Sequence, residues 1–161
     1  MVRALLTLLC AIALGLVLVG LRRGWRNRGR RQAGLGALPA APPLSEPLLQ
    51  QDGVYIGTAY ATSWQDRVVH AGLGVRANAT LTLHPEGVLI DREGAEAVFL
   101  PAADLLGARL APALAGKVMG AGGLLVVQWQ LGGSVLDSGF RADDKSSYPA
   151  WVRAINERVR T

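Results

Sequence analysis

Residues 124–141 read LLVVQWQLGGSVLDSGFR, and this stretch decides the fold. Residues 124–131 are rich in aliphatic, β-branched and aromatic side chains, which is typical of a buried strand. Gly132-Gly133 is a two-residue hairpin signal, and residues 134–141 return as the partner strand. The hairpin predicts an antiparallel β-sheet with an apolar core.

Five further strand-like segments precede this hairpin, each bounded by turn signals. They share β-branched and aromatic residues or an alternation of polar and apolar side chains, and they cover residues 54–61, 80–83, 88–90, 97–100 and 105–110. A looser segment at 62–76 and a glycine-rich loop at 116–123 lie between some of them. With the hairpin, they predict about seven antiparallel strands.

A C-terminal amphipathic helix follows the strands. Trp151, Ile155 and Val159 recur at four-residue spacing and are expected to face the sheet. Ser147 is expected to cap this helix, and Pro149 suits its first turn. The predicted fold class is therefore a mainly-β domain, an antiparallel sandwich or barrel with one C-terminal helix.

The chain begins with a candidate membrane anchor. Residues 4–21 carry no charged side chain, and as a helix they extend roughly 27 Å, close to the ~30 Å core of a bilayer. An arginine cluster follows directly and is expected to contact anionic lipid: Arg22, Arg23, Arg26, Arg28, Arg30 and Arg31. Because arginines beside a span mark the cytoplasmic side, we expect the N-terminus outside and the C-terminal domain in the cytoplasm, at the plasma membrane.

Composition sets the remaining boundaries. The predicted parts are the anchor (1–21), a basic juxtamembrane segment (22–31), a linker rich in proline, glycine and alanine (32–52) and the domain (53–161). Alternatives are a cleaved signal peptide, a lipoprotein processed at Cys10, and a domain released by cleavage near residues 40–41. The length of the apolar run and the arginines after it favour an uncleaved anchor.

The net charge of +5 belongs to the N-terminal part of the chain. Residues 1–52 carry seven arginines and two acidic side chains, whereas residues 53–161 carry ten basic and ten acidic ones. A nucleic-acid-binding domain is expected to be basic in its own right, so the neutral domain argues against a nucleic-acid partner. The single cysteine, Cys10, excludes an intramolecular disulfide.

Several short stretches resemble those of a known family. They read YIGT at 55–58, WQDR at 64–67, GLGVR at 72–76, PAADL at 101–105, AGK at 115–117 and DSGFR at 137–141. Together with the anchor they resemble actinobacterial membrane-anchored proteins with a pleckstrin-homology-like (PH-like) domain, an uncharacterised family often labelled as membrane, export or transporter proteins. The resemblance implies seven strands and a terminal helix at a membrane, without catalytic residues. Where phosphoinositide-binding PH domains carry a basic cluster, this chain offers only Arg67 and Arg76, so that function does not transfer.

Cofactor motifs are incomplete. The glycines of GLGVRA at 72–77 have the spacing of a dinucleotide-binding fingerprint, but a strand and not a helix is predicted after them. Gly116-Lys117 is followed by Val118 in place of the Ser or Thr of a phosphate-binding loop. We therefore expect no cofactor.

Metal binding and catalysis have little support. His70 and His84 are the only histidines, they are not at helical i, i+4 spacing, and His84 is expected to face solvent in a turn before Pro85. Asp66, Arg67 and His70, with Ser63 nearby, form a loose cluster that is more typical of ordinary hydrogen bonding than of acid–base catalysis. We expect neither a metal site nor a catalytic residue.

These observations favour a non-enzymatic, single-pass membrane protein whose cytoplasmic PH-like domain binds or scaffolds a protein partner. The expected partner surface combines an aromatic side chain with positive charge: Trp64, Arg67, His70, Arg76 and Lys117. The alternatives are an accessory subunit of a membrane transporter or export system and, in another class, a small enzyme. The partner, the oligomeric state and the docking of the linker stay open.

Overall fold

The computed structural model describes residues 10–20, 22, 24 and 32–160, which belong to two units, residues 1–34 and 35–161. In the first unit, residues 10–20 are helical. Residues 1–9 and 21 of the predicted anchor lie outside the described residues, as do five arginines of the predicted cluster, Arg23, Arg26, Arg28, Arg30 and Arg31. Within the described part of the chain, no helix has the length and apolar character that a membrane span requires.

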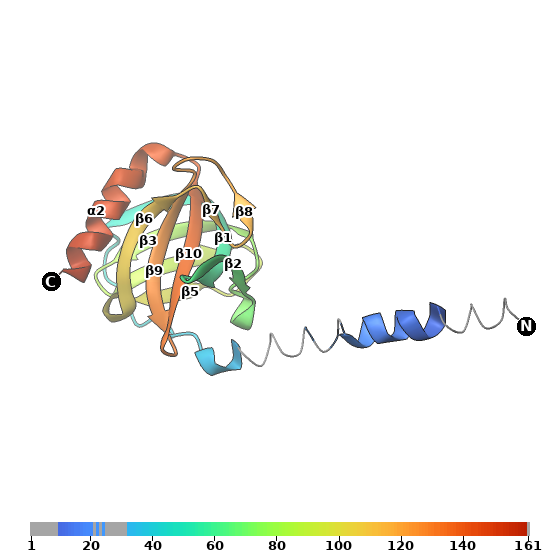
Figure 1. The fold of residues 1–161 in the computed structure, drawn as a ribbon. Coiled ribbons are helices and arrows are strands. Elements are labelled where there is room, and N and C mark those ends of the chain that lie inside the picture. The colour runs from blue at the N-terminus through green and yellow to red at the C-terminus, as the bar shows by residue number, and fades with distance from the viewer. Residues whose placement is uncertain (1–9, 21, 23, 25–31, 161) are drawn as a thin grey trace, which may run out of the picture. The chain divides into compact units, whose positions relative to one another are not determined.

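The second unit carries the strands and one longer helix, labelled in Figure 1. In chain order they are β1 (Leu49–Tyr60), β2 (Ser63–Val68), β3 (Ala77–His84), β4 (Gly87–Arg92), β5 (Val98–Pro101), β6 (Leu105–Ala111), β7 (Ala113–Leu114), β8 (Lys117–Val118), β9 (Leu124–Leu131), β10 (Ser134–Ala142) and α2 (Tyr148–Val159). Short 3₁₀ helices lie at Ala33–Leu35, His70–Gly72, Ala102–Asp104 and Lys145–Ser147.

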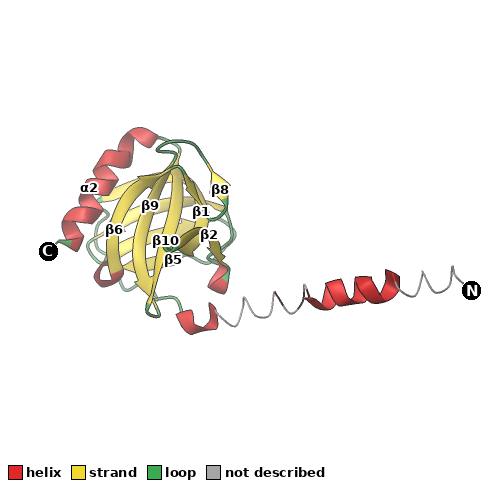
Figure 2. Cartoon of the chain, in the orientation of Figure 1, coloured by secondary structure: helices red, strands yellow, loops and turns green. Residues whose placement is uncertain are grey.

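One long strand, β1, joins the two halves of the main antiparallel sheet. The strand order is β5-β4-β3-β1-β10-β9-β6, and β2 also pairs with β1. The first part of β1 pairs with β3 and the second part with β10, so the sheet curls around its core (Figure 2). Tyr55, Trp129, Phe140 and Trp151 are among the largest buried side chains of that core. The predicted mainly-β domain with a C-terminal helix is confirmed.

The helix α2 packs beside β6 (Figure 1) and buries Tyr148, Trp151 and Ile155. The structure changes two details of the predicted helix. Val159 is 39 % exposed, because it lies in the last turn of the helix. Ser147 occupies the N-cap position of α2, but its side chain makes no capping hydrogen bond, because its hydroxyl donates to Asp144 O at 2.9 Å. A 3₁₀ turn precedes α2, and the carboxylate of Asp144 caps that turn by accepting a hydrogen bond from the Ser146 N–H.

Two segments predicted as loops contain strands. The segment 62–76 includes β2, and the region of the glycine-rich loop includes β8, which pairs with β7. These strands are short, and neither shows a long alternation of polar and apolar residues. Their pairing depends on neighbours that are distant in the sequence, which a local pattern does not reveal.

The strap, residues 35–48, is attached to the domain. Leu35 is 2 % exposed and belongs to the core, and β1 begins at Leu49, four residues before the predicted domain boundary. Both histidines donate to strap carbonyls, His70 Nε2 to Gly36 O at 2.6 Å and His84 Nδ1 to Ser45 O at 2.8 Å. The prediction that His84 faces solvent is therefore wrong, since this residue is only 7 % exposed.

Glu86 gives the strap a pH-dependent contact. Its carboxylate accepts hydrogen bonds from the hydroxyl and the backbone N–H of Ser45, and these bonds lower the pKa of Glu86 below its ordinary value. A lowered pKa stabilises the attached strap at pH values above the unfolded-state pKa, and this contribution is lost as the pH falls through the lowered value.

We therefore expect the Ser45 amide NMR signal to titrate with a midpoint below the ordinary glutamate range. The variant Glu86→Gln removes the ionisable carboxylate and should remove this transition. An identical titration of the Ser45 signal in both proteins would contradict the contact.

Candidate functional site

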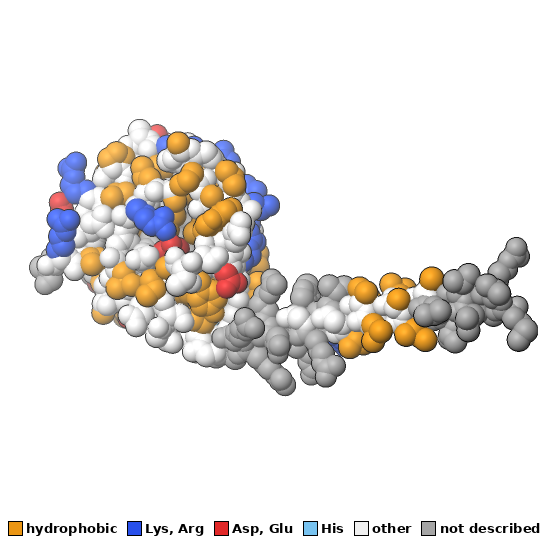
Figure 3. All heavy atoms as spheres, viewed as in Figure 1, with side chains coloured by type: hydrophobic (Ala, Val, Ile, Leu, Met, Phe, Trp, Pro, Cys, Tyr) orange, Lys and Arg blue, Asp and Glu red, His pale blue; other side chains and the backbone are white. Residues whose placement is uncertain are grey.

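The candidate site is built from β2 and from the β7–β8 hairpin, which lie outside the main strand path. We name Trp64, Lys117 and Val118 the hairpin surface. The backbone N–H of Gly116 donates to Trp64 O at 3.2 Å, so the two elements are in direct contact. In the view of Figure 3, hydrophobic side chains gather on the face of the domain where Figure 1 places β7 and β8.

A pair of glycines lets the hairpin rest on the sheet. Gly57 in β1 lies opposite Gly139 in β10. A Cβ atom added to Gly139 would approach Leu114 Cδ2 to 2.6 Å, and one added to Gly57 would lie 3.5 Å from Ala115 Cβ. The hairpin thus fills the space that two side chains would occupy. It completes a second apolar cluster on the outer face of the sheet: Ile56, Ala59, Ala111, Leu114, Ala115, Leu124 and Val126.

The hairpin turns through two residues with positive φ, Ala115 at 50° and Gly116 at 73°. This is the conformation of a type I′ turn. A positive φ destabilises a residue that has a side chain, here Ala115, by about 1–2 kcal/mol. Arg67 holds the strained position, because its Nη2 and Nε atoms donate to Ala115 O at 2.7 and 3.2 Å. Its Nη1 atom donates to Gly74 O at 2.8 Å, so one guanidinium joins the hairpin to the 62–76 segment.

Three consecutive carbonyls fix the loop between β2 and β3. Gly72 O accepts from Arg92 Nη1 at 2.6 Å, Leu73 O accepts from the Tyr55 hydroxyl at 2.8 Å, and Gly74 O accepts from Arg67. The backbone N–H of Thr58 also donates to Leu73 O. The segment that carries the predicted partner residues is therefore tied to the sheet at each of these positions.

The Tyr55 bond belongs to a buried chain of hydroxyl groups. Because Tyr55 uses its one proton on Leu73 O, Thr58 Oγ1 donates to Tyr55 over 2.7 Å, and Ser138 in turn donates to Thr58 over 2.6 Å. Trp129 Nε1 completes the chain by donating to Ser138 Oγ at 3.0 Å. Burial raises the pKa of Tyr55 to about 12, so the phenol stays protonated and keeps donating at neutral pH.

The structure brings only some of the predicted partner residues together. Trp64 on β2 is 42 % exposed, and Lys117 on β8 is also exposed. Arg67 is half-buried, and its guanidinium is bonded to the backbone carbonyls of Ala115 and Gly74. His70 bonds to the strap, and Arg76 lies apart on a shallow hollow that it lines with Asn78 and Glu93.

Two residues near this site have an exposure that the sequence does not predict. Val118 is 72 % exposed, although a valine beside a glycine-rich loop gives no signal of exposure. Arg92 is 4 % exposed, whereas its sequence Arg92-Glu93-Gly94 predicts an ordinary surface turn. The guanidinium of Arg92 lies 5.3 Å from the ring centroid of Tyr55 and binds Glu96 O as well as Gly72 O.

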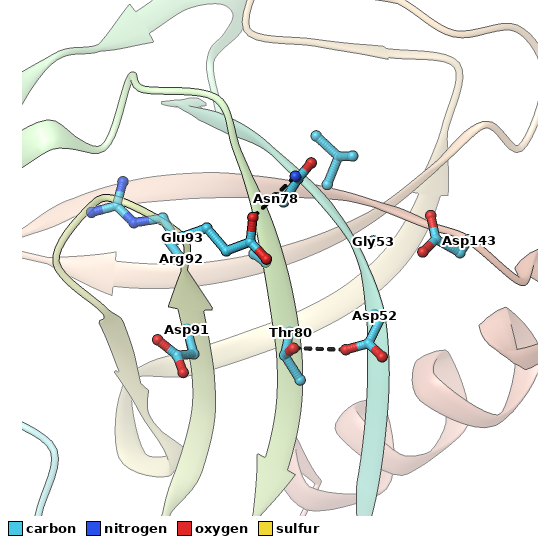
Figure 4. A pocket seen from close by; sticks show the side chains of 10 residues that line it. Asp52, Gly53, Asn78, Thr80, Asp91, Arg92, Glu93 and Asp143 are labelled. Atoms are coloured by element: carbon cyan, nitrogen blue, oxygen red, sulfur yellow. Dashed lines mark hydrogen bonds between the residues drawn. The ribbon is translucent and has the colours of Figure 1, made fainter.

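A groove of about 630 Å³ lies elsewhere on the sheet and is lined by carboxylates (Figure 4). Asp52 accepts from Thr80 Oγ1 at 2.6 Å, and Glu93 accepts from Asn78 Nδ2 at 3.1 Å. Asp91 and Asp143 are the other carboxylates of the lining, which also includes Arg92. Among the described residues, no group of three or more ligating side chains is arranged to hold a metal ion. The hydrogen bonds of this groove connect neighbouring strands.

Arg67 offers a direct test of how the hairpin is held. Arg67→Met keeps an apolar stem but removes the donors to Ala115 O and Gly74 O, so we expect local opening of the hairpin to become about tenfold more frequent, or about 1.4 kcal/mol. Hydrogen exchange at residues 113–119 measures this change. Arg76→Met is the matched control, because Arg76 is exposed. Unchanged exchange in Arg67→Met would show that Arg67 does not hold the hairpin.

Comparison with known proteins places this geometry in context. The family model described as "Bacterial PH domain-like" matches residues 35–156, a range that includes the strap. A chain in the solved structure "The 8S snRNP Assembly Intermediate" is similar in fold, with a TM-score of 0.50 and 10 % identity over 76 % of this chain and 89 % of that chain. The C-terminal domain of an unknown protein from Leishmania infantum aligns with a TM-score of 0.44 and 9 % identity over 88 % and 99 %. No curated protein matches the chain.

Proposed function

This chain belongs to the bacterial PH domain-like family, and from that premise we propose that its domain is a non-catalytic binding or scaffold module for a protein partner. PH-like domains typically act as binding modules, so family membership supports the class of function. The partner surface in this proposal is the hairpin surface, with Arg67 as the residue that positions it.

The observation that carries the proposal is the exposure of two large apolar side chains on a fixed backbone. Trp64 and Val118 are 42 % and 72 % exposed, and Lys117 precedes Val118 on the same short strand. Aromatic anchors dominate the energetics of protein interfaces, and a surface that is already ordered loses little entropy on binding. The lysine favours a partner with an acidic group beside its apolar contact.

The proposal places this module at the inner face of the plasma membrane. The uncharged run at residues 4–21 and the arginines at 22–31 support a single-pass anchor with a cytoplasmic C-terminal domain. The helical conformation of residues 10–20 is compatible with such an anchor. In this reading the chain is one of the actinobacterial membrane-anchored PH-like proteins that its sequence resembles.

Membrane topology and partner binding are tested in the same cells. A compartment-sensitive reporter fused after Thr161 should give the signal of a cytoplasmic location. Full-length protein extracted in mild detergent should co-purify with a partner. That partner should be lost from Trp64→Ala and from Lys117→Glu, and retained by Arg153→Ala, a change on the exposed face of α2. A reporter signal from outside the cell would overturn the location, and partner retention by both hairpin variants would overturn the binding surface.

A further inference from the structure

A short tether joins the domain to the proposed anchor, on which this inference rests. Arg31, the last arginine of the cluster, stands four residues before Leu35. Leu35 is 2 % exposed and belongs to the core of the domain, so the tether ends there. Four residues span at most about 14 Å even when they are fully extended. The surface of the domain around the start of the strap is therefore kept close to the headgroups that the arginines are expected to contact.

The loop between β2 and β3 lies at the start of the strap. His70 Nε2 donates to Gly36 O at 2.6 Å, one residue after the buried leucine. Two valines of this loop, Val69 and Val75, are each 53 % exposed. A Cβ atom on Gly74 would lie 3.3 Å from Val69 Cγ1, and Val75 follows Gly74 directly, so the two valines are neighbours. The loop thus presents an apolar surface beside the end of the tether.

The charge and the fixed backbone of this loop suit an anionic lipid surface. Residues 69–76 carry no acidic side chain, and the exposed Arg76 follows Val75. Arg76 lines a shallow hollow with Glu93, but in the described part of the chain it makes no ion pair. The carbonyls of residues 72–74 all accept hydrogen bonds from side chains of the domain, so the loop loses little conformational entropy when it binds a surface.

The tether favours a lipid surface over a protein as the occupant of this loop. Apolar side chains beside a cation match the boundary between acyl chains and anionic headgroups, and the tether keeps the loop at that boundary. We name Val69, Val75 and Arg76 the lipid loop. We propose that the lipid loop rests on the anionic inner surface of the membrane and thereby orients the domain.

The test places one fluorophore beside the lipid loop in the full-length protein. Cys10→Ser removes the native cysteine, and Ala71→Cys, at an exposed position, takes an environment-sensitive fluorophore without changing the lipid loop. The protein is reconstituted in vesicles of phosphatidylcholine and phosphatidylglycerol. A lipid with a nitroxide on its headgroup should quench this fluorophore at least threefold.

The matched control carries the fluorophore at Lys145→Cys. The loop is bonded to β1 through Leu73 O and the Thr58 N–H, and Thr58 pairs with Ser138 in β10. From there β10 continues for four residues, about 13 Å along the sheet, before the chain reaches the exposed Lys145. Position 145 therefore lies away from the lipid loop, and its fluorophore should be quenched at least twofold less than that at position 71.

Two further changes separate a lipid contact from mere proximity to the membrane. Val69→Asp together with Val75→Asp should lower the quenching at position 71 to that of the control, and both valines are exposed enough for the fold to persist. Vesicles of phosphatidylcholine alone should lower it at least twofold without any further change of the chain. Quenching at position 71 that neither change lowers would overturn the lipid contact.

The failure of this contact is distinct from the failure of the anchor. Equal quenching at positions 71 and 145, in protein that stays in the vesicles after a wash with alkaline carbonate, would overturn the lipid contact and leave the anchor in place. Protein that the wash removes from the vesicles would overturn the anchor and the lipid contact together.

Discussion

Replacing Arg92 by methionine should destabilise the domain by about 3 kcal/mol and lower its Tm by about 10 °C. The arginine is 4 % exposed, and its guanidinium donates to Gly72 O and twice to Glu96 O. Methionine fills much of the same apolar space but makes none of these hydrogen bonds, and a hydrogen bond from a charged group contributes about 1.5–3 kcal/mol. Urea denaturation of the full-length protein in detergent, followed by tryptophan fluorescence, measures the loss.

Arg76→Met is the control for this change. It removes the same charge from the same loop region, but Arg76 is exposed, so the expected effect is within about 0.5 kcal/mol. Equal effects of the two substitutions would contradict the structural role of Arg92. A large loss confined to Arg92→Met would identify it as the residue that ties the loop between β2 and β3 to the rest of the sheet.

Replacing Trp64 by alanine should weaken partner binding by about 2 kcal/mol or more, roughly thirtyfold, with little change in Tm. A tryptophan at the centre of an interface commonly contributes this much. Trp64 is 42 % exposed and belongs to neither apolar core cluster, so we expect its loss to change the stability of the fold little. Calorimetric titration of the purified partner into each purified protein measures the affinity, and thermal unfolding of each protein measures its stability.

Val118→Asp tests the same surface from the β8 side. Its side chain is 72 % exposed, so a charge there does not disturb the core, but it opposes an apolar contact with a partner. Val159→Asp on α2 is the matched control, since Val159 is also exposed and α2 packs against β6. An unaltered affinity in Val118→Asp, or an equal loss in Val159→Asp, would argue against the hairpin surface.

The parts of the fold that the sequence predicts are those with a pattern in adjacent residues. The hairpin β9–β10 carries its own turn signal and apolar strands, and Trp151 and Ile155 carry helical spacing, so these elements follow from adjacent residues. The attachment of the strap does not follow from adjacent residues. Its prolines and glycines indicate a linker, whereas its attachment depends on His70, His84 and Glu86, which are distant in the sequence. Contacts between distant segments decided that part of the structure.

The candidate site shows the same division. An exposed aromatic residue and a lysine, Trp64 and Lys117, can be proposed from residue type. The role of Arg67 cannot, because the carbonyl that it binds lies 48 residues away at Ala115. Residues that position a surface are therefore harder to predict than residues that form it.

The most direct test of the central claim is photo-crosslinking in intact cells from position 118. A photoreactive side chain at Val118 should capture one discrete protein, a chain with the same group at Val159 should not, and adding Trp64→Ala should abolish the capture. Equal capture from both positions, or capture that persists without Trp64, would contradict the proposal that this PH-like domain binds its partner through the hairpin surface.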